Sequence, residues 1–65
     1  MSLQKYLALL KTVELGSFSL AAEQMGYTQP AVSRMIADLE AQWKVELLRR
    51  NRSGLEPSAA CLQLL

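Results

Sequence analysis

The sequence predicts a mainly α-helical domain in which three helices precede a small two-stranded β-hairpin and the start of a further helix. Two observations support this fold class. Apolar residues recur every three or four positions within residues 3–13 and 32–43, which is the period of a helix that buries one face. From residue 45 the pattern alternates, and turn-forming residues interrupt it at 51–54, as in a hairpin. A chain of 65 residues has room for one small domain.

The first two helices follow from apolar spacing and from turn residues. The first is expected at about residues 2–14, because four apolar side chains spaced by 3, 4 and 3 share one face: Leu3, Tyr6, Leu10 and Val13. Gly16 suits the end of this helix. Ser17 and Ser19 both offer a side-chain oxygen that can cap the next helix, which is expected at about residues 19–25.

The third helix has the clearest pattern in the chain. Thr28 or Gln29 can cap it, and Pro30 fits its first turn, where the missing N–H would be unpaired in any case. An apolar stripe spaced by 4, 3 and 4 then runs along about three turns: Val32, Ile36, Leu39 and Trp43. We expect this stripe to face the core. The aromatic residues are likewise interpreted as core side chains: Tyr6, Phe18, Tyr27 and Trp43.

The spacing across the second and third helices is that of a helix-turn-helix. Such a unit needs a small residue where the helices touch, a glycine that adopts positive φ in the turn, and apolar residues facing inward on both sides. Ala22, Gly26 and Val32 meet these needs. An ordinary helical hairpin obeys the same packing rules, so the spacing favours DNA binding and leaves that alternative open.

The second half of the chain predicts the hairpin and a last helix. Residues 45–50 alternate, Asn51-Arg52-Ser53-Gly54 is rich in turn formers, and residues 55–57 follow as the returning strand. Ser58 could cap a final helical segment at residues 59–65. This segment ends abruptly with leucines, which suggests that the chain stops inside an element.

Charge is distributed unevenly, although the net charge is only +1. Four of the seven basic residues fall at positions 44–52, and no acidic residue occurs at 24–37 or 47–55. Both stretches could therefore approach a polyanion without repulsion. The first turns of the third helix carry side chains suited to base edges: Gln29 for adenine, Arg34 for guanine, Ser33 for a base or phosphate, and Pro30 for a thymine methyl. Cations at the hairpin tip suit phosphates or a narrow minor groove.

Three stretches resemble the N-terminal winged helix-turn-helix domain of LysR-type transcriptional regulators. Gly16-Ser17-Phe18-Ser19-Leu20-Ala21-Ala22-Glu23 is similar to the family run GSFTxAAE. Residues 28–40, from Thr28-Gln29-Pro30 to Asp38-Leu39-Glu40, are similar to SQPALSRxIxxLE, and residues 45–50 resemble the ending GVxLFxR. The resemblance covers residues 3–65 without gaps.

The resemblance implies sequence-specific binding of double-stranded DNA by a bacterial transcription regulator. It places seven residues at family positions that meet DNA, five in the third helix and two in the wing: Thr28, Gln29, Pro30, Ser33, Arg34, Arg50 and Arg52. It implies a winged helix-turn-helix domain at residues 1–57 and the start of a linker helix at 58–65. It further implies a homo-oligomeric full-length protein that reads two-fold related half-sites, and a small co-inducer bound by a domain absent from this chain.

Several positions depart from the family pattern. Lys44 stands where a glycine is usual, and a left-handed backbone there would cost a non-glycine residue roughly 1–2 kcal/mol. Leu48 replaces the usual phenylalanine, and residues 57–61 replace a Leu-Thr-x-Ala-Gly type segment. Cys61 in that segment is interpreted as a small packing residue rather than a reactive thiol.

Composition argues against other classes of protein. The chain has no histidine to activate a serine or cysteine, no phosphate-binding glycine loop and no carboxylate pair spaced for acid–base work, so we expect neither catalysis nor a metal or cofactor. One cysteine and a longest apolar run of five residues predict a soluble cytoplasmic protein without a membrane partner. A small helical module that binds protein through the same fold is the alternative function.

Overall fold

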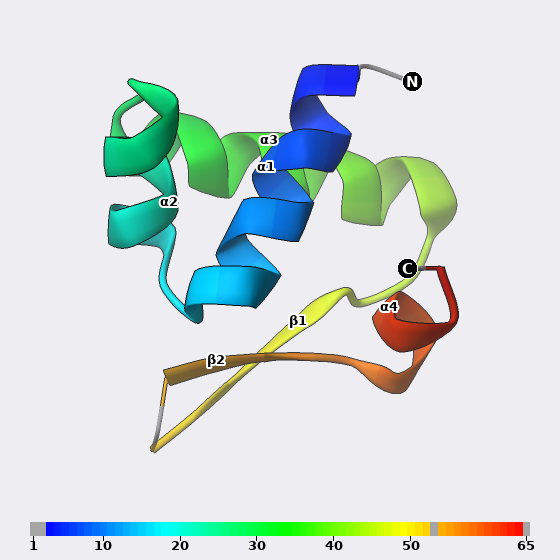
Figure 1. The fold of residues 1–65 in the computed structure, drawn as a ribbon. Coiled ribbons are helices and arrows are strands. Elements are labelled where there is room, and N and C mark those ends of the chain that lie inside the picture. Colours follow the sequence, from blue (N-terminus) through cyan, green and yellow to red (C-terminus); the bar gives the residue numbers. More distant parts are fainter. Residues whose placement is uncertain (1–2, 53, 65) are drawn as a thin grey trace.

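The computed structural model describes residues 3–52 and 54–64 (Figure 1). In chain order its elements are α1 (Leu3–Leu15), α2 (Phe18–Met25), α3 (Gln29–Trp43), β1 (Leu48–Asn51), β2 (Gly54–Pro57) and α4 (Ala59–Leu64). This order confirms the expected mainly α fold with a hairpin. The predicted helix start at Ser2, the turn position Ser53 and the helix end at Leu65 lie outside the described residues. Within the part of the chain that the structure describes, no helix has the length and apolarity needed to cross a membrane.

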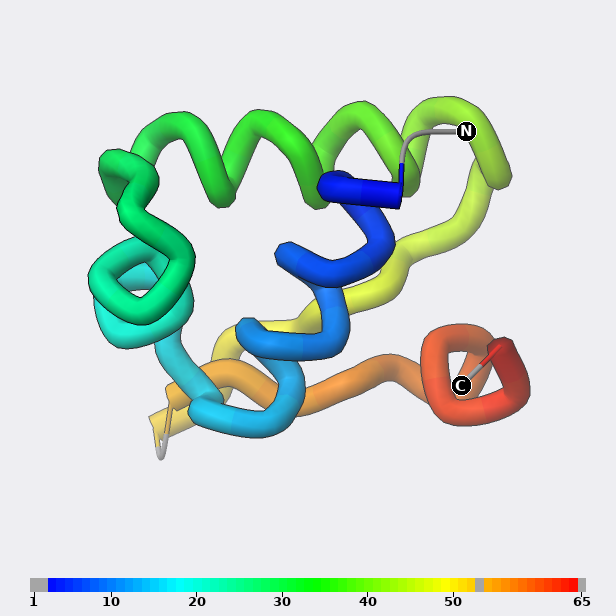
Figure 2. Tube along the Cα trace, turned by 45° about the horizontal axis from the view of Figure 1, so that its top comes forward, coloured from blue at the N-terminus to red at the C-terminus, as the bar shows by residue number. Residues whose placement is uncertain are grey.

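The three long helices form one layer and the hairpin lies beneath them. α3 runs along one side, α1 crosses it, and α2 stands at the end where α3 begins (Figure 2). The strands are antiparallel, with Leu48 opposite Pro57 and Asn51 opposite Gly54. α4 follows β2 and returns toward the end of α3 (Figure 1). The hairpin and the start of α3 therefore remain open to solvent.

Side-chain caps fix where α2 and α3 begin. Ser17 accepts the N–H of Leu20 at 3.2 Å, so α2 starts at Phe18, one residue earlier than expected. Thr28 accepts the N–H of Ala31 at 3.3 Å and is therefore the cap of α3. Gly26 between the two helices has φ of 75°, a conformation that costs glycine little. The predicted helix-turn-helix is confirmed, with this glycine in its turn.

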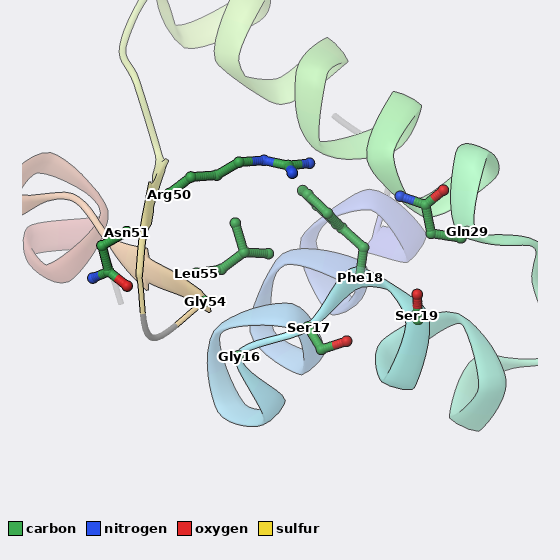
Figure 3. Close-up of a pocket in the computed structure, with 9 residues that line it drawn as sticks. All are labelled: Gly16, Ser17, Phe18, Ser19, Gln29, Arg50, Asn51, Gly54 and Leu55. Carbon is green, nitrogen blue, oxygen red and sulfur yellow. The ribbon is translucent and has the colours of Figure 1, made fainter.

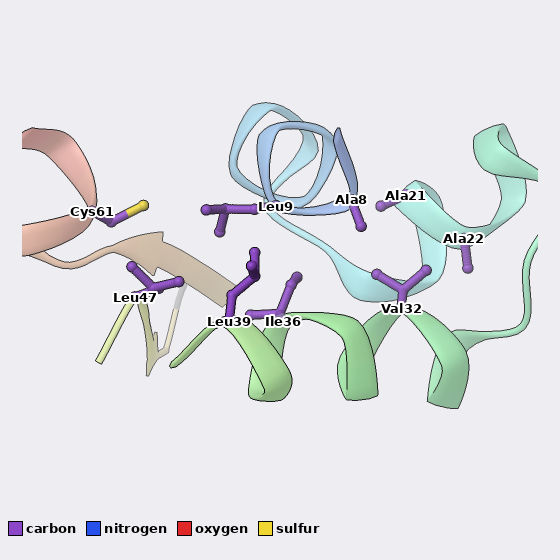
Figure 4. Close-up of a cluster of buried hydrophobic side chains, with 9 residues drawn as sticks. All are labelled: Ala8, Leu9, Ala21, Ala22, Val32, Ile36, Leu39, Leu47 and Cys61. Carbon is purple, nitrogen blue, oxygen red and sulfur yellow. The ribbon is translucent and has the colours of Figure 1, made fainter. Parts of the chain in front are cut away.

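Nine buried side chains form the core, and every helix contributes to it (Figure 4): Ala8, Leu9, Ala21, Ala22, Val32, Ile36, Leu39, Leu47 and Cys61. The α3 stripe is confirmed, with Trp43 half-buried at its end. The two alanines of α2 are small, which lets α2 and α3 approach closely. The core thus depends on the same small residue at position 22 that the helix-turn-helix spacing required.

The buried face of α1 differs from the predicted apolar stripe. Ala8, Leu9 and Thr12 are fully buried, whereas Leu3 is 71% exposed. The small Ala8 allows a close helix contact, and the Thr12 hydroxyl donates to the Ala8 carbonyl at 2.8 Å, so its polar group is satisfied inside the core. The other three residues of the predicted stripe, Tyr6, Leu10 and Val13, are half-buried, and Val13 packs against the core cluster. Apolar spacing therefore indicated a face beside the most buried one, because it did not take into account a small residue and a threonine that satisfies its own hydroxyl.

The wing begins later than the alternation predicted, at Leu48 rather than Val45. The Glu40 carboxylate accepts the N–H of Leu47 at 2.7 Å and the N–H of Leu48 at 3.4 Å. The N–H of Val45 donates to the Glu40 carbonyl at 3.2 Å. The N–H groups of Val45 and Leu47 are therefore bound to α3 and are not available for a strand ladder, and Leu48 is the first residue that pairs with β2.

Ser58 connects the end of the wing to its beginning. Its N–H donates to the Leu47 carbonyl at 2.8 Å, and its hydroxyl donates to the Glu46 carbonyl. The same oxygen accepts the N–H of Cys61 at 3.0 Å, which confirms Ser58 as the cap of α4. One serine thus joins the last helix to the segment that leaves α3.

Lys44 has the left-handed backbone that its sequence position suggested, with φ of 56° and ψ of 41°. Its N–H donates to the Glu40 carbonyl and closes the end of α3. Among the described residues it is the one non-glycine residue with positive φ.

We expect Lys44→Gly to stabilise the domain by ~1 kcal/mol, because relief of ~1–2 kcal/mol of left-handed strain exceeds the added unfolded-state entropy of glycine. Lys44→Ala is the matched control, since it removes the side chain and keeps the Cβ atom that causes the strain. Urea unfolding measures both variants. Equal stabilisation by alanine would show that charge, not backbone strain, is the cause.

We expect Glu40→Ala to destabilise the domain by ~2–3 kcal/mol, because it leaves buried N–H groups without their charged acceptor. Glu40→Gln keeps one acceptor oxygen and should therefore lose less stability than Glu40→Ala. Amide hydrogen exchange at Leu47 and Leu48, measured together with global unfolding, checks whether the loss is local to the wing. Unchanged exchange at both amides in Glu40→Ala would contradict this role.

Candidate nucleic-acid interface

The start of α3 presents most of the predicted base-reading side chains to solvent. Gln29, Pro30 and Arg34 are exposed, and Ser33 is half-buried. Thr28 is exposed too, but its hydroxyl oxygen already caps the helix. The capped end therefore offers an amide, a hydroxyl and a guanidinium within two helical turns.

Arg34 is oriented by a chain of ion pairs. Its Nε atom lies 3.5 Å from Asp38 Oδ1, and Lys5 Nζ of α1 lies 3.2 Å from Asp38 Oδ2. The hydrogen bond from Lys5, helped by the nearby positive charges of Lys5 and Arg34, lowers the pKa of Asp38, so the carboxylate stays ionised at neutral pH. The Arg34 side chain nevertheless remains 81% exposed. Asp38 therefore restrains the Arg34 side chain but leaves it exposed to solvent.

The wing presents its arginines on different sides. Neighbouring strand residues point to opposite faces, and Arg49 and Arg50 have different partners. Arg49 Nε lies 3.4 Å from Glu46 Oε1. The Arg50 guanidinium carbon instead lies 5.8 Å from the centre of the Phe18 ring. Arg52 is exposed in the turn that follows β1.

A cleft of about 290 Å³ lies where the wing meets the starts of α2 and α3 (Figure 3). It is lined by Gly16, Ser17, Phe18, Ser19, Gln29, Arg50, Asn51, Gly54 and Leu55. Two of the predicted site residues, Gln29 and Arg50, thus line the same cleft although they are 21 positions apart in the sequence. Arg34 and Arg52 are not among these lining residues.

Close backbone contact holds the wing against the cleft. A Cβ atom at Gly54, which has φ of 124°, would lie 3.3 Å from the carbonyl oxygen of Gly16. Few side chains tolerate both that backbone conformation and that distance. Gly54 therefore allows β2 to approach the turn between α1 and α2, which brings Arg50 within reach of Phe18.

Phe18 is the site residue that the sequence did not indicate. It was interpreted as a core side chain, and it does pack against the buried cluster while remaining half-buried. Its ring also faces Arg50 across the cleft (Figure 3). No local pattern signals a contact between two residues 32 positions apart. The Arg34–Asp38 pair, by contrast, has the i, i+4 spacing that a sequence can reveal.

The described residues contain no group of three or more His, Cys, Asp or Glu side chains placed to hold a metal ion. Cys61 is fully buried, and burial, helped by the negative charge of Glu40, raises the pKa of its thiol. A buried protonated thiol packs as a small apolar group.

Three helices with a helix-turn-helix, followed by a basic two-stranded wing, define a winged helix-turn-helix domain of the kind found in regulatory proteins. The chain belongs to the lysR family of bacterial regulatory helix-turn-helix proteins, whose family model matches residues 3–62.

Relatives and solved structures agree with this membership. The chain is 37% identical over 60 residues to the nitrogen assimilation regulatory protein nac of Klebsiella aerogenes, covering 92% of this chain and 20% of that protein. The CbnR DBD–DNA complex matches with a TM-score of 0.92 at 31% identity, over 100% of this chain and 75% of that one. DarR of Vibrio fischeri in complex with DNA matches with a TM-score of 0.92 at 30% identity, over 98% of this chain and 22% of that one. The chain spans less than a third of the length of the curated relatives that it matches.

Proposed function

We propose that this chain is the sequence-specific, double-stranded DNA-binding domain of a bacterial transcription regulator. The observation that carries the proposal is the joint placement of an exposed polar start of α3 and a basic wing at one cleft. A capped helix with such side chains fits the major groove, and a basic hairpin beside it reaches the flanking backbone or minor groove. Similar domains have been solved in complex with DNA, which supports DNA binding by this chain.

Each of the five predicted DNA-contacting residues at the start of α3, including its cap, has a role set by its chemistry. Arg34 forks onto the O6 and N7 atoms of a guanine, and Gln29 bonds an adenine edge in the same bidentate way. Pro30 offers apolar contact to a thymine methyl. Ser33 bonds a base or a phosphate, and Thr28 fixes the start of the helix through its cap while it faces the backbone.

Arg50 and Arg52 supply affinity that depends little on sequence. Both are exposed cations on or next to β1, and such groups neutralise phosphates or enter a narrow minor groove. Glu40 and Gly54 set where these cations stand relative to α3. The wing therefore positions the domain on the duplex while α3 reads the bases.

The same proposal covers the longer protein. Residues 1–57 form the reading domain, and α4 begins a linker helix at Ser58 that leads to a domain binding a small co-inducer. The full-length protein is a homo-oligomer that reads two-fold related half-sites in the cytoplasm, and it has no catalytic activity. The chain's coverage of its relatives, less than a third of their length, is consistent with such an additional domain.

We expect Arg34→Ala to weaken binding to the preferred site by ~1–3 kcal/mol and to relax selection at one base pair, because a bidentate guanine contact is lost. The preferred site comes from selection out of random duplex DNA. Arg49→Ala is the matched control, since Arg49 is an exposed arginine paired with Glu46 on the wing.

Two outcomes would count against this account. Equal loss on selected and random DNA would assign Arg34 to a phosphate. Binding that does not weaken as salt rises would favour the protein-binding alternative, because DNA binding releases counterions.

We expect the 65-residue chain to be monomeric or weakly associating and to bind a single half-site poorly. The described part of α4 has six residues, and two-helix contacts normally need several turns. Two copies joined by a linker that spans ~34–36 Å should bind paired half-sites more tightly. Sedimentation equilibrium checks the first statement. A tight dimer at micromolar concentration would show that another surface makes the contact.

A further inference from the structure

Three arginines of the candidate interface are held in different ways. Arg34 and Arg49 each lie beside a carboxylate, Asp38 in one case and Glu46 in the other. The guanidinium of Arg50 lies over the Phe18 ring, 5.8 Å from its centre. A carboxylate partner neutralises a guanidinium, whereas an aromatic face attracts the cation and leaves its charge in place. Arg50 is therefore oriented and still available to an external anion.

The ring that holds Arg50 is itself fixed. Phe18 is the first residue of α2, directly after the Ser17 cap, and it packs against the core cluster. The wing lies on the other side of the cleft, where Gly54 approaches Gly16 closely. The Arg50 side chain extends from β1 toward the Phe18 ring, as Figure 3 shows.

The surroundings of the cleft suit an anion. Among the described residues that line it, Arg50 alone carries a charge. Ser19, exposed at the start of α2, adds a hydroxyl, and Gln29 approaches from α3 with its amide (Figure 3). The guanidinium and these neutral donors together match a phosphodiester, for which a planar fork of N–H groups is the preferred partner.

We propose that Phe18 is a positioning residue that holds the Arg50 guanidinium over this cleft, where it binds a DNA backbone phosphate next to the base read by Gln29. This inference rests on the proposed function. It separates Arg50 from Arg52: Arg50 makes a phosphate contact from β1, where it pairs with Leu55, and Arg52 acts from the turn. It also gives Phe18 a role beyond packing.

A double-mutant cycle on DNA affinity tests the pair. Phe18→Leu keeps an apolar side chain and removes the aromatic face, and Phe18→Tyr keeps the ring. Binding to a short duplex of mixed sequence is measured by fluorescence anisotropy over a range of KCl concentrations, with folding of each variant checked by circular dichroism. Phe18→Leu is also made in the Arg50→Ala background, which completes the cycle. The same change in the Arg49→Ala background is the matched control.

We expect Phe18→Leu to weaken binding by about two- to five-fold, the equivalent of an exposed cation–π contact, and Phe18→Tyr to restore most of it. Arg50→Ala should flatten the salt slope by about one unit, as for one phosphate. In the Arg50→Ala background Phe18→Leu should have no further effect. In the Arg49→Ala background it should retain its full effect.

A loss from Phe18→Leu that is equally large in the Arg50→Ala background would overturn the inference, because Phe18 would then act through packing alone. If Phe18→Leu does not fold, NMR of the wild-type chain decides: upfield ring-current shifts of the Arg50 side-chain protons, kept in the duplex complex, support the pair, and their absence refutes it. Two joined wild-type copies that bind no duplex would defeat the proposed function itself. Wild-type duplex binding without Phe18–Arg50 coupling would defeat only this inference.

Discussion

The position of the wing depends on one carboxylate, that of Glu40. It accepts the N–H groups of Leu47 and Leu48 at the point where the chain has left α3 and β1 begins, so α3 and the wing are joined by hydrogen bonds as well as by a loop. Charge-assisted bonds of this kind are stronger than bonds between neutral groups. Leu47 is fully buried and its carbonyl accepts the N–H of Ser58, which connects α4 to the same point. The spacing between the side chains of α3 and those of β1 is therefore set inside the domain before any ligand arrives.

Two surface arginines are likewise positioned in the free protein, before a ligand binds. Arg34 is held by Asp38, which is held in turn by Lys5 from α1, and Arg50 lies over Phe18. Long cationic side chains lose conformational entropy when they bind, and a contact in the free protein reduces that loss. The two kinds of contact differ in what remains for a ligand. A carboxylate must give up part of its attraction when a base or phosphate takes its place, whereas an aromatic ring keeps one face of the guanidinium and leaves its edge free.

Local signals predicted the elements, and contacts between distant residues decided the rest. The cap at Ser58, the turn glycine and the stripe of α3 follow from residue types within a few positions of one another. The sequence left two candidates for each of the other caps, and the structure selected Ser17 and Thr28. The buried face of α1 could not be read from apolar spacing, because Thr12 satisfies its own hydroxyl and Ala8 owes its burial to its small size. The start of β1 was also misplaced, since an acceptor seven residues upstream occupies the N–H groups that a strand would use. At the candidate site, the sequence indicated Gln29 and Arg50 separately, while their meeting at one cleft with Phe18 required the fold.

In the proposed complex, a cation held on β1 affects which bases are read as well as how tightly the domain binds. Phosphate contacts set register, and base contacts specify sequence. In the proposed complex Arg50 meets the backbone at the cleft that Gln29 also lines, so the position of one phosphate determines which base edge faces the glutamine. Arg34 lies five residues, more than one helical turn, further along α3 and outside the residues that line the cleft, so its base is separated from that phosphate by the rise of the helix. Glu40 connects the wing to α3. In the proposed complex this connection sets the distance between the phosphate that Arg50 binds and the two bases that Gln29 and Arg34 read.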